Sequence, residues 1–191
     1  ERQTQHWMDV VRFADTRGFH SDDQYPIWPY RDYVLQAFDE NLPFDKFTRE
    51  QLAGDLLPEA TERQRTASAF NRLNRTSVEG GIQEKEYVAK YGADRVRTVG
   101  LTWFAQTIGC AECHDHKYDP LKQSDFYALK AFFADMKHPS AYGGQLDLPS
   151  AAQSERQRQL QRQAEAAQAE LDKLADGTKK ELTAHQQTAL A

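Results

Sequence analysis

The sequence predicts an all-α protein. In most segments of the 191-residue chain, apolar residues recur three or four positions apart, as they do along one face of an α-helix. No segment alternates apolar and polar residues convincingly with a period of two, so we predict no β-strand. Over residues 150–191, leucines and alanines recur at alternating spacings of four and three, which is typical of a coiled-coil seam.

Composition and charge suggest the domain organisation and argue against two kinds of partner. Hydrophobic residues make up 39% of the chain and aromatic residues 11%, which is enough for a buried core. Because the aromatic residues stop before the tail, we expect a helical domain over residues 1–149 and a helical appendage over residues 150–191. The net charge of −5 argues against binding to nucleic acid or to an anionic membrane surface. No run of about 18 apolar residues predicts a membrane span, and no signal peptide is recognised, so we expect a piece of a longer protein.

Six helices are expected in the first domain. Thr61 and Gln64 have the spacing of a capping box, Pro43 suits a first helical position and Ser124 suits an N-cap. Gly92 and Gly100 interrupt the longest pattern, where they allow a kink, a close helix crossing or the approach of a flat ligand. The expected helices cover residues 3–16, 30–41, 43–54, 61–73, 83–107 and 124–136.

The tail is expected to form a helical hairpin. Asp176 and Gly177 together resemble a turn, and residues 181–191 can return as a second arm. Two heptads are too short for a stable isolated coil, so the tail must pack on itself or on a partner. The seam consists of Leu160, Ala164, Ala167, Leu171 and Leu174.

Both cysteines of the chain lie in residues 110–116, Cys-Ala-Glu-Cys-His-Asp-His, which we call the cysteine segment. Cys-x-x-Cys-His is the attachment signature of a c-type haem, because Cys110 and Cys113 are spaced to bond both vinyl groups of one porphyrin. Three alternatives remain open: a thioredoxin-like redox pair, a zinc site that adds His114 and His116, and a short-loop disulfide. We expect one haem c, because no βαβ pattern supports the redox pair and adjacent zinc ligands would struggle to face one ion.

Within this interpretation, His114 is the expected proximal iron ligand. His116 follows two residues later, on the same side of the macrocycle, and is expected to hydrogen-bond a haem propionate or a backbone carbonyl. A distal ligand must come from elsewhere, although each candidate also has an ordinary role at a helix surface, in a loop or as core filler. The candidates are His6, Met8, His20, Met136 and His138.

Arg12, Arg95 and Arg97 can pair with haem propionates, and a surface or helix–helix ion pair is an equal alternative for each. The expected fold is therefore an irregular multi-helix domain around a covalently bound haem, followed by the tail hairpin. The expected function is electron transfer to a redox partner protein or a neighbouring domain, and we assign no catalytic residue. The alternatives are a haem enzyme or a gas- or peroxide-binding site with an open sixth iron position, and a structural or interaction module.

Eight stretches carry a resemblance to a known family, namely residues 6–16, 30–34, 43–47, 50–58, 70–72, 79–81, 94–96 and 109–120. On these stretches the chain resembles the cytochrome c-like domain of exported planctomycete proteins, long filed as a domain of unknown function. The resemblance covers most of residues 6–135 and leaves the tail outside. It implies a covalently bound haem c within a longer exported protein, so the expected location is periplasmic or otherwise extracytoplasmic. Because His6 lies in a matching stretch, we rank it first among the distal candidates.

Overall fold

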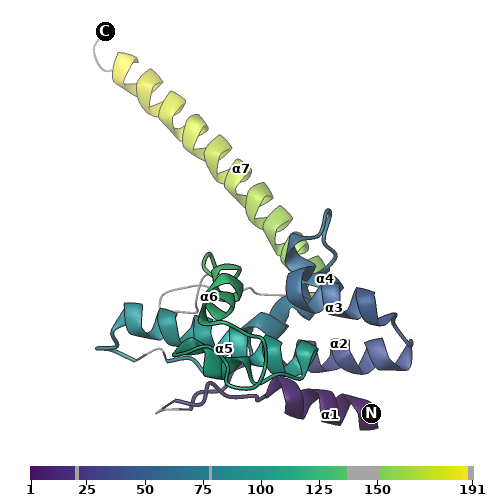
Figure 1. Ribbon diagram of the computed structural model, residues 1–191. Coiled ribbons are helices and arrows are strands. Elements are labelled where there is room, and N and C mark those ends of the chain that lie inside the picture. Colours follow the sequence, from purple (N-terminus) through teal and green to yellow (C-terminus); the bar gives the residue numbers. More distant parts are fainter. Residues whose placement is uncertain (20–21, 78, 137–150, 189–191) are drawn as a thin grey trace. The chain divides into compact units, whose positions relative to one another are not determined.

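The computed structural model describes residues 1–19, 22–77, 79–136 and 151–188 (Figure 1). Within these ranges the protein is predominantly helical, with seven α-helices, three short 3₁₀ helices and no strand, so the predicted all-α class is confirmed. The chain forms two compact units, Glu1–Leu146 and Asp147–Ala191. None of the helices found in these ranges combines the length and the apolar character needed to cross a membrane.

In the first unit, the residues that the structure describes up to Met136 form six α-helices and three 3₁₀ helices (Figure 1). The α-helices are α1 (Arg2–Val11), α2 (Trp28–Asp39), α3 (Phe44–Ala53), α4 (Glu62–Ala67), α5 (Glu84–Phe104) and α6 (Gln123–Ala131). The 3₁₀ helices are η1 (Gly54–Leu56), η2 (Ser68–Arg72) and η3 (Ile108–Glu112).

Of two predicted helix starts, one is confirmed and one is wrong. The capping box at the start of α4 is confirmed, because the Gln64 amide donates to Thr61 Oγ1 at 3.2 Å and the Thr61 amide donates to Gln64 Oε1 at 3.0 Å. Ser124 is not the N-cap of α6; Lys122 is, and its amide donates to the Asp125 carboxylate at 2.9 Å. A carboxylate at the third helical position has taken the capping role that the sequence pattern gave to a hydroxyl.

The first helix ends five residues before its predicted end. Arg12 adopts the left-handed conformation, with φ 60° and ψ 41°, and its amide donates to the Asp9 carbonyl. This conformation is usually adopted by glycine or asparagine. The sequence has an arginine here, and apolar periodicity carries no information on backbone conformation, so the early helix end was not predicted. From this position the Arg12 guanidinium reaches Asp94 of α5, with an N–O distance of 2.7 Å.

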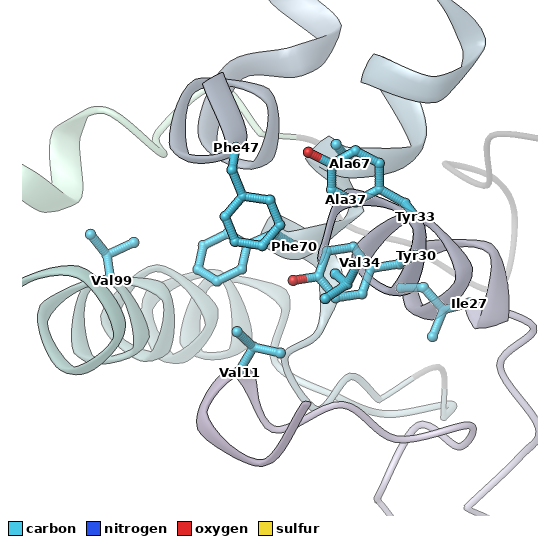
Figure 2. Close-up of a cluster of buried hydrophobic side chains, with 10 residues drawn as sticks. All are labelled: Val11, Ile27, Tyr30, Tyr33, Val34, Ala37, Phe47, Ala67, Phe70 and Val99. Atoms are coloured by element: carbon cyan, nitrogen blue, oxygen red, sulfur yellow. The ribbon is translucent and has the colours of Figure 1, made fainter. Parts of the chain in front are cut away.

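The larger core lies where α1, α2, α3, α5 and the α4–η2 segment meet (Figure 2). Trp7 packs edge-on against Phe47 and Trp103, with ring centroids 4.8 and 5.2 Å apart. A polar network crosses this apolar interior: the Tyr30 hydroxyl donates to Gln51 Oε1 at 2.5 Å, and Trp7 Nε1 donates to the same oxygen at 3.2 Å. Both Tyr30 and Gln51 are fully buried, so each depends on the other for its hydrogen bonds.

Gly54, at the start of η1, lets two segments approach more closely than any other residue would. A Cβ built there would lie 2.1 Å from the Gln64 carbonyl oxygen, which is backbone and cannot rotate away. Gly54→Ala is therefore expected to lower the free energy of unfolding by about 3 kcal/mol, measured by urea denaturation. Gly80→Ala is the matched control, because nothing lies within 4 Å of its added Cβ, and it should change stability by less than about 0.5 kcal/mol. Equal effects of the two substitutions would contradict the steric argument.

A smaller core, made by α5, η3 and α6, places the cysteine segment. Ile108 and Ala111 of η3 are buried against Val96 and Phe126. Gly100 of α5 makes this possible, because a Cβ there would lie 2.2 Å from Ile108 Cγ2. Gly92 and Gly100 were expected to allow a kink, a close helix crossing or the approach of a flat ligand. At Gly100 the structure shows a close contact between α5 and η3.

In the second unit, the described residues 151–188 form one helix, α7 (Ala151–Thr188), of 38 residues. The predicted hairpin is wrong, because α7 continues through Asp176 and Gly177 without a turn. One glycine costs a helix only about 1 kcal/mol relative to alanine, and the flanking leucine, alanine and lysine residues are strong helix formers. The side chains of residues 153–176 are exposed except for Ser154, which is half-buried.

Candidate functional site

The cysteine segment is anchored from beneath by the smaller core. After α5, Ala105 takes the left-handed conformation and the Gln106 amide donates to the Gly100 carbonyl at 3.0 Å, which turns the chain sharply into η3. Ile108 is 5% exposed and Ala111 is fully buried. Because these two residues face the core, the intervening part of η3 is left at the surface.

The two thiols lie on one turn of that surface. Cys110 and Cys113 are both exposed and free, and the Cys113 amide points to the Cys110 carbonyl at 3.5 Å. Gln123 and Tyr127 hold the turn from α6, each donating to the Glu112 carbonyl, at 3.1 and 3.2 Å. The pair is thus presented to solvent on a backbone that its neighbours fix.

His114 is exposed and has a defined ring tautomer. Its Nδ1 lies 2.7 Å from the Asp115 carbonyl oxygen. A carbonyl can only accept a hydrogen bond, so Nδ1 carries a proton, and in the neutral ring Nε2 then carries the lone pair. Metal-binding histidines commonly use this arrangement, in which one ring nitrogen donates to a carbonyl and the other binds the metal.

His116 is buried, with a side chain 5% exposed, and both of its ring nitrogens are engaged. Nδ1 accepts the amides of Asp119 at 2.9 Å and Tyr118 at 3.3 Å, so Nε2 carries the proton and donates to Thr107 Oγ1 at 3.2 Å. With Nδ1 unprotonated, the nearby Asp119 carboxylate forms no ion pair with the ring. His116 was expected to bond a propionate or a carbonyl; instead it accepts two backbone amides and closes the loop after the cysteines.

An exposed apolar face of α5 flanks the cysteine segment. Arg97 of α5 forms an ion pair with Glu112, and a Cβ at Gly109 would lie 3.0 Å from Arg97 Cγ. Leu101 and Phe104 follow Arg97 by four and seven residues, so they share its face of the helix. They are 52% and 58% exposed. Nothing in the sequence pattern singled out this face before the fold was known.

Residues 1–138 match the family PSCyt2, described as a protein of unknown function (DUF1549). The chain belongs to this family. Comparisons with curated proteins and with solved structures gave no match.

This match corrects the family expected from the sequence. The chain was expected to be a cytochrome c-like domain of exported planctomycete proteins. The description of the matching family names neither a function nor a cofactor. Within the described ranges, the two cysteines are exposed and free, and no group of three or more His, Cys, Asp or Glu side chains is placed to hold a metal ion. The zinc alternative also loses a ligand, because both nitrogens of His116 have other partners.

The arginines expected at haem propionates have protein partners in the PSCyt2 domain. Arg12 makes a bidentate pair with Asp94, at 2.7 and 2.9 Å, and also contacts the Thr98 hydroxyl. These contacts are the helix–helix ion pair that was the alternative to propionate binding.

Arg95 is only 5% exposed, so its side chain is not accessible to a ligand at the surface. Its Nε donates to the Asn71 carbonyl at 2.7 Å and a terminal nitrogen donates to Asn74 Oδ1 at 3.2 Å. Burial, with a smaller contribution from the positive charge of Arg72, lowers the pKa of Arg95 to about 10. Arg95 therefore ties α5 to the end of η2, and the propionate role expected for it finds no support in these contacts.

The candidate distal ligands lie on different elements of the PSCyt2 domain. His6 is exposed on α1, and Met8 of the same helix packs against the larger core. Met136 is half-buried after α6. His20 and His138 lie outside the described residues. Met8 has the core-filling environment that was the alternative to iron binding.

Proposed function

We propose that the cysteine segment attaches one haem c covalently and that this PSCyt2 domain transfers electrons. Cys110 and Cys113 would hold the group through two thioether bonds, and His114 would bind its iron through Nε2. The observation that carries the proposal is the bond from His114 Nδ1–H to the Asp115 carbonyl, which leaves Nε2 free beside two accessible thiols. When bound, the haem would supply a one-electron iron couple.

The surroundings of the segment suit this role. Each thiol must be reduced and accessible to add across a vinyl group, and both cysteines are exposed and free. A haem iron takes four ligands from its porphyrin, so the protein needs to supply only one or two. Leu101 and Phe104 offer exposed apolar surface on the helix face beside the segment, of the kind that covers a macrocycle.

The proposed haem implies a cellular location and a redox partner. Haem c is attached outside the cytoplasm, so the protein would work in the periplasm or another extracytoplasmic compartment. The electron would pass to a redox protein or to a neighbouring domain of a longer polypeptide. The proposed location and the proposed partner both depend on the presence of the haem.

Protein made with the haem attachment machinery is expected to be coloured, to give a pyridine haemochrome spectrum and to gain the mass of one haem. Cys110→Ser with Cys113→Ser should remove the added mass and leave the fold, read by far-UV circular dichroism, unchanged. Ser124→Ala serves as a control hydroxyl change on α6 and should keep the haem. If the protein without substitutions, made with this machinery, has the mass of the polypeptide alone, the proposal is wrong.

The same material separates the two haem functions. An electron carrier with both axial positions filled should bind carbon monoxide slowly or not at all in the reduced state. Rapid binding would favour the second candidate, a gas- or peroxide-binding site with an open sixth position.

A further inference from the structure

The two cysteines of the chain lie one above the other on a 3₁₀ turn. Cys110 belongs to η3, and Cys113 is the C-cap of that helix, with φ −108° and ψ −29° in the right-handed helical region. The Cys110 amide donates to the Thr107 carbonyl at 3.1 Å, and the Cys113 amide points to the Cys110 carbonyl at 3.5 Å. Residues three apart in a 3₁₀ helix eclipse one another, so both side chains leave the backbone on the same side. Both thiols are exposed and free.

The backbone of this turn is fixed by its neighbours before any ligand binds. Ile108 and Ala111 anchor it in the smaller core. From α6, the side chains of Gln123 and Tyr127 both donate to the Glu112 carbonyl. A ligand that bridges the two sulfurs therefore has little backbone to order, which favours binding.

The oxygen ligands of the cysteine segment are committed to protein partners. The Glu112 carboxylate forms an ion pair with Arg97, and Asp115 Oδ1 accepts the Gln123 amide at 2.8 Å. His116 is engaged at both ring nitrogens. Within the described ranges, no His, Asp or Glu side chain, His114 included, is placed with the two thiols as a third metal ligand. The turn thus offers a metal ion two sulfur ligands.

Two thiolates without a further ligand select one kind of metal. Zinc in protein sites almost always takes four ligands, and calcium and magnesium take oxygen. Cu(I) is a soft ion that thiolates bind strongly, and two of them satisfy it in a near-linear S–Cu–S arrangement. The donor set therefore favours Cu(I) over the commoner divalent ions.

We propose that the chain, before any haem is attached, binds one Cu(I) ion between Cys110 Sγ and Cys113 Sγ. Two S–Cu bonds form, the two thiol protons pass to solvent, and the copper keeps its oxidation state. The site uses the same sulfurs as the proposed haem attachment, so one molecule carries either copper or haem. The copper site does not require the haem proposal to hold.

A competition titration tests the site. The full chain, made without the haem attachment machinery, is reduced, kept free of oxygen and titrated with Cu(I) in the presence of bicinchoninate, a coloured Cu(I) chelator. We expect each chain to withdraw one equivalent of copper from the chelator. A chain that withdraws none would overturn the proposal.

Single substitutions test the ligands. Cys110→Ser and Cys113→Ser should each weaken binding by more than the roughly 100-fold that loss of an outer partner of a metal ligand can cost. Ser124→Ala, an exposed hydroxyl change on α6, should leave the titration unchanged. Binding that survives either cysteine substitution would place the copper elsewhere and reject the site.

X-ray absorption at the copper edge counts the ligands directly. We expect two sulfur ligands and no nitrogen, and the same spectrum in His114→Ala. A nitrogen ligand that disappears in His114→Ala would show a three-ligand site and reject the two-sulfur assignment. Zinc, titrated against a coloured zinc indicator, should bind at least about 100-fold more weakly than Cu(I). Equal affinities would contradict the selection by ligand number.

The copper and haem proposals fail independently. Haem-loaded protein, whose two sulfurs would be thioethers, should withdraw no Cu(I) from bicinchoninate, and uptake by loaded protein would reject the copper site. Protein that never acquires haem and still binds one Cu(I) would refute the haem proposal alone. Protein that acquires haem, but binds no Cu(I) when made without the attachment machinery, would refute the copper proposal alone.

Discussion

Gln51→Leu is expected to lower the free energy of unfolding by about 3 kcal/mol. Gln51 is fully buried, and its Oε1 accepts the Tyr30 hydroxyl at 2.5 Å and Trp7 Nε1 at 3.2 Å. Leucine has a similar size but no acceptor, so the Tyr30 hydroxyl would remain buried without its partner. Burial raises the pKa of Tyr30 well above its ordinary value, which keeps this hydroxyl protonated and in need of an acceptor. Urea denaturation of the two proteins measures the difference.

The control is a double-mutant cycle with Tyr30→Phe. Removing both partners should cost less than the sum of the single changes, because the double variant leaves no unpaired Tyr30 hydroxyl. Trp7 Nε1 also lies 3.1 Å from the Tyr30 oxygen, so some loss at Trp7 should persist in the double variant. Additive costs would show that the network contributes no coupling.

His114→Ala is expected to abolish the normal ligation of a haem attached to this chain. The substitution removes the ring whose Nε2 is left available, while Cys110 and Cys113 remain. We expect the visible spectrum to change from low-spin to high-spin, or the amount of attached haem to fall by at least about tenfold. Absorption spectra and intact mass, on protein made with the attachment machinery, distinguish these outcomes.

His185→Ala, in α7, is the matched control and should leave both the spectrum and the haem content unchanged. Added imidazole should restore the low-spin spectrum of His114→Ala if the lost ring was an iron ligand. A His114→Ala protein with an unchanged spectrum would assign the iron to another residue. The same measurement on His6→Ala tests the first-ranked distal candidate.

The helices of this chain could be predicted because their signals are local. The apolar periods placed α2, α3 and α5 within a few residues of their observed ends, and the Thr61 capping box was read directly. The end of α1 was missed because Arg12 adopts a left-handed conformation, which local apolar periodicity does not signal for an arginine, and its partner Asp94 lies 82 positions away. The continuous α7 was missed because Asp176-Gly177 resembles a turn when the helix formers around it are ignored.

The site shows the same division between local and distant information. The spacing of Cys110, Cys113 and His114 is visible in the sequence, and the structure adds the tautomer that the Asp115 carbonyl imposes. The partners of Arg95 could not be predicted, since Asn71 of η2 and Asn74, just after η2, lie 24 and 21 residues away. Sequence periodicity assigns residues to faces, but it does not say which face meets which.

The loop built around His116 also bears on how an iron would choose between two neighbouring imidazoles. His114 and His116 are separated by one residue, so both are candidates to bind the iron of a haem attached at Cys110 and Cys113. The fold resolves this ambiguity in advance, because one ring is committed to three hydrogen bonds and the other is left with an open nitrogen. If a haem is attached as proposed, ligation of its iron by His116 would first require this loop to lose its hydrogen bonds, so the stability of the loop would favour ligation by His114.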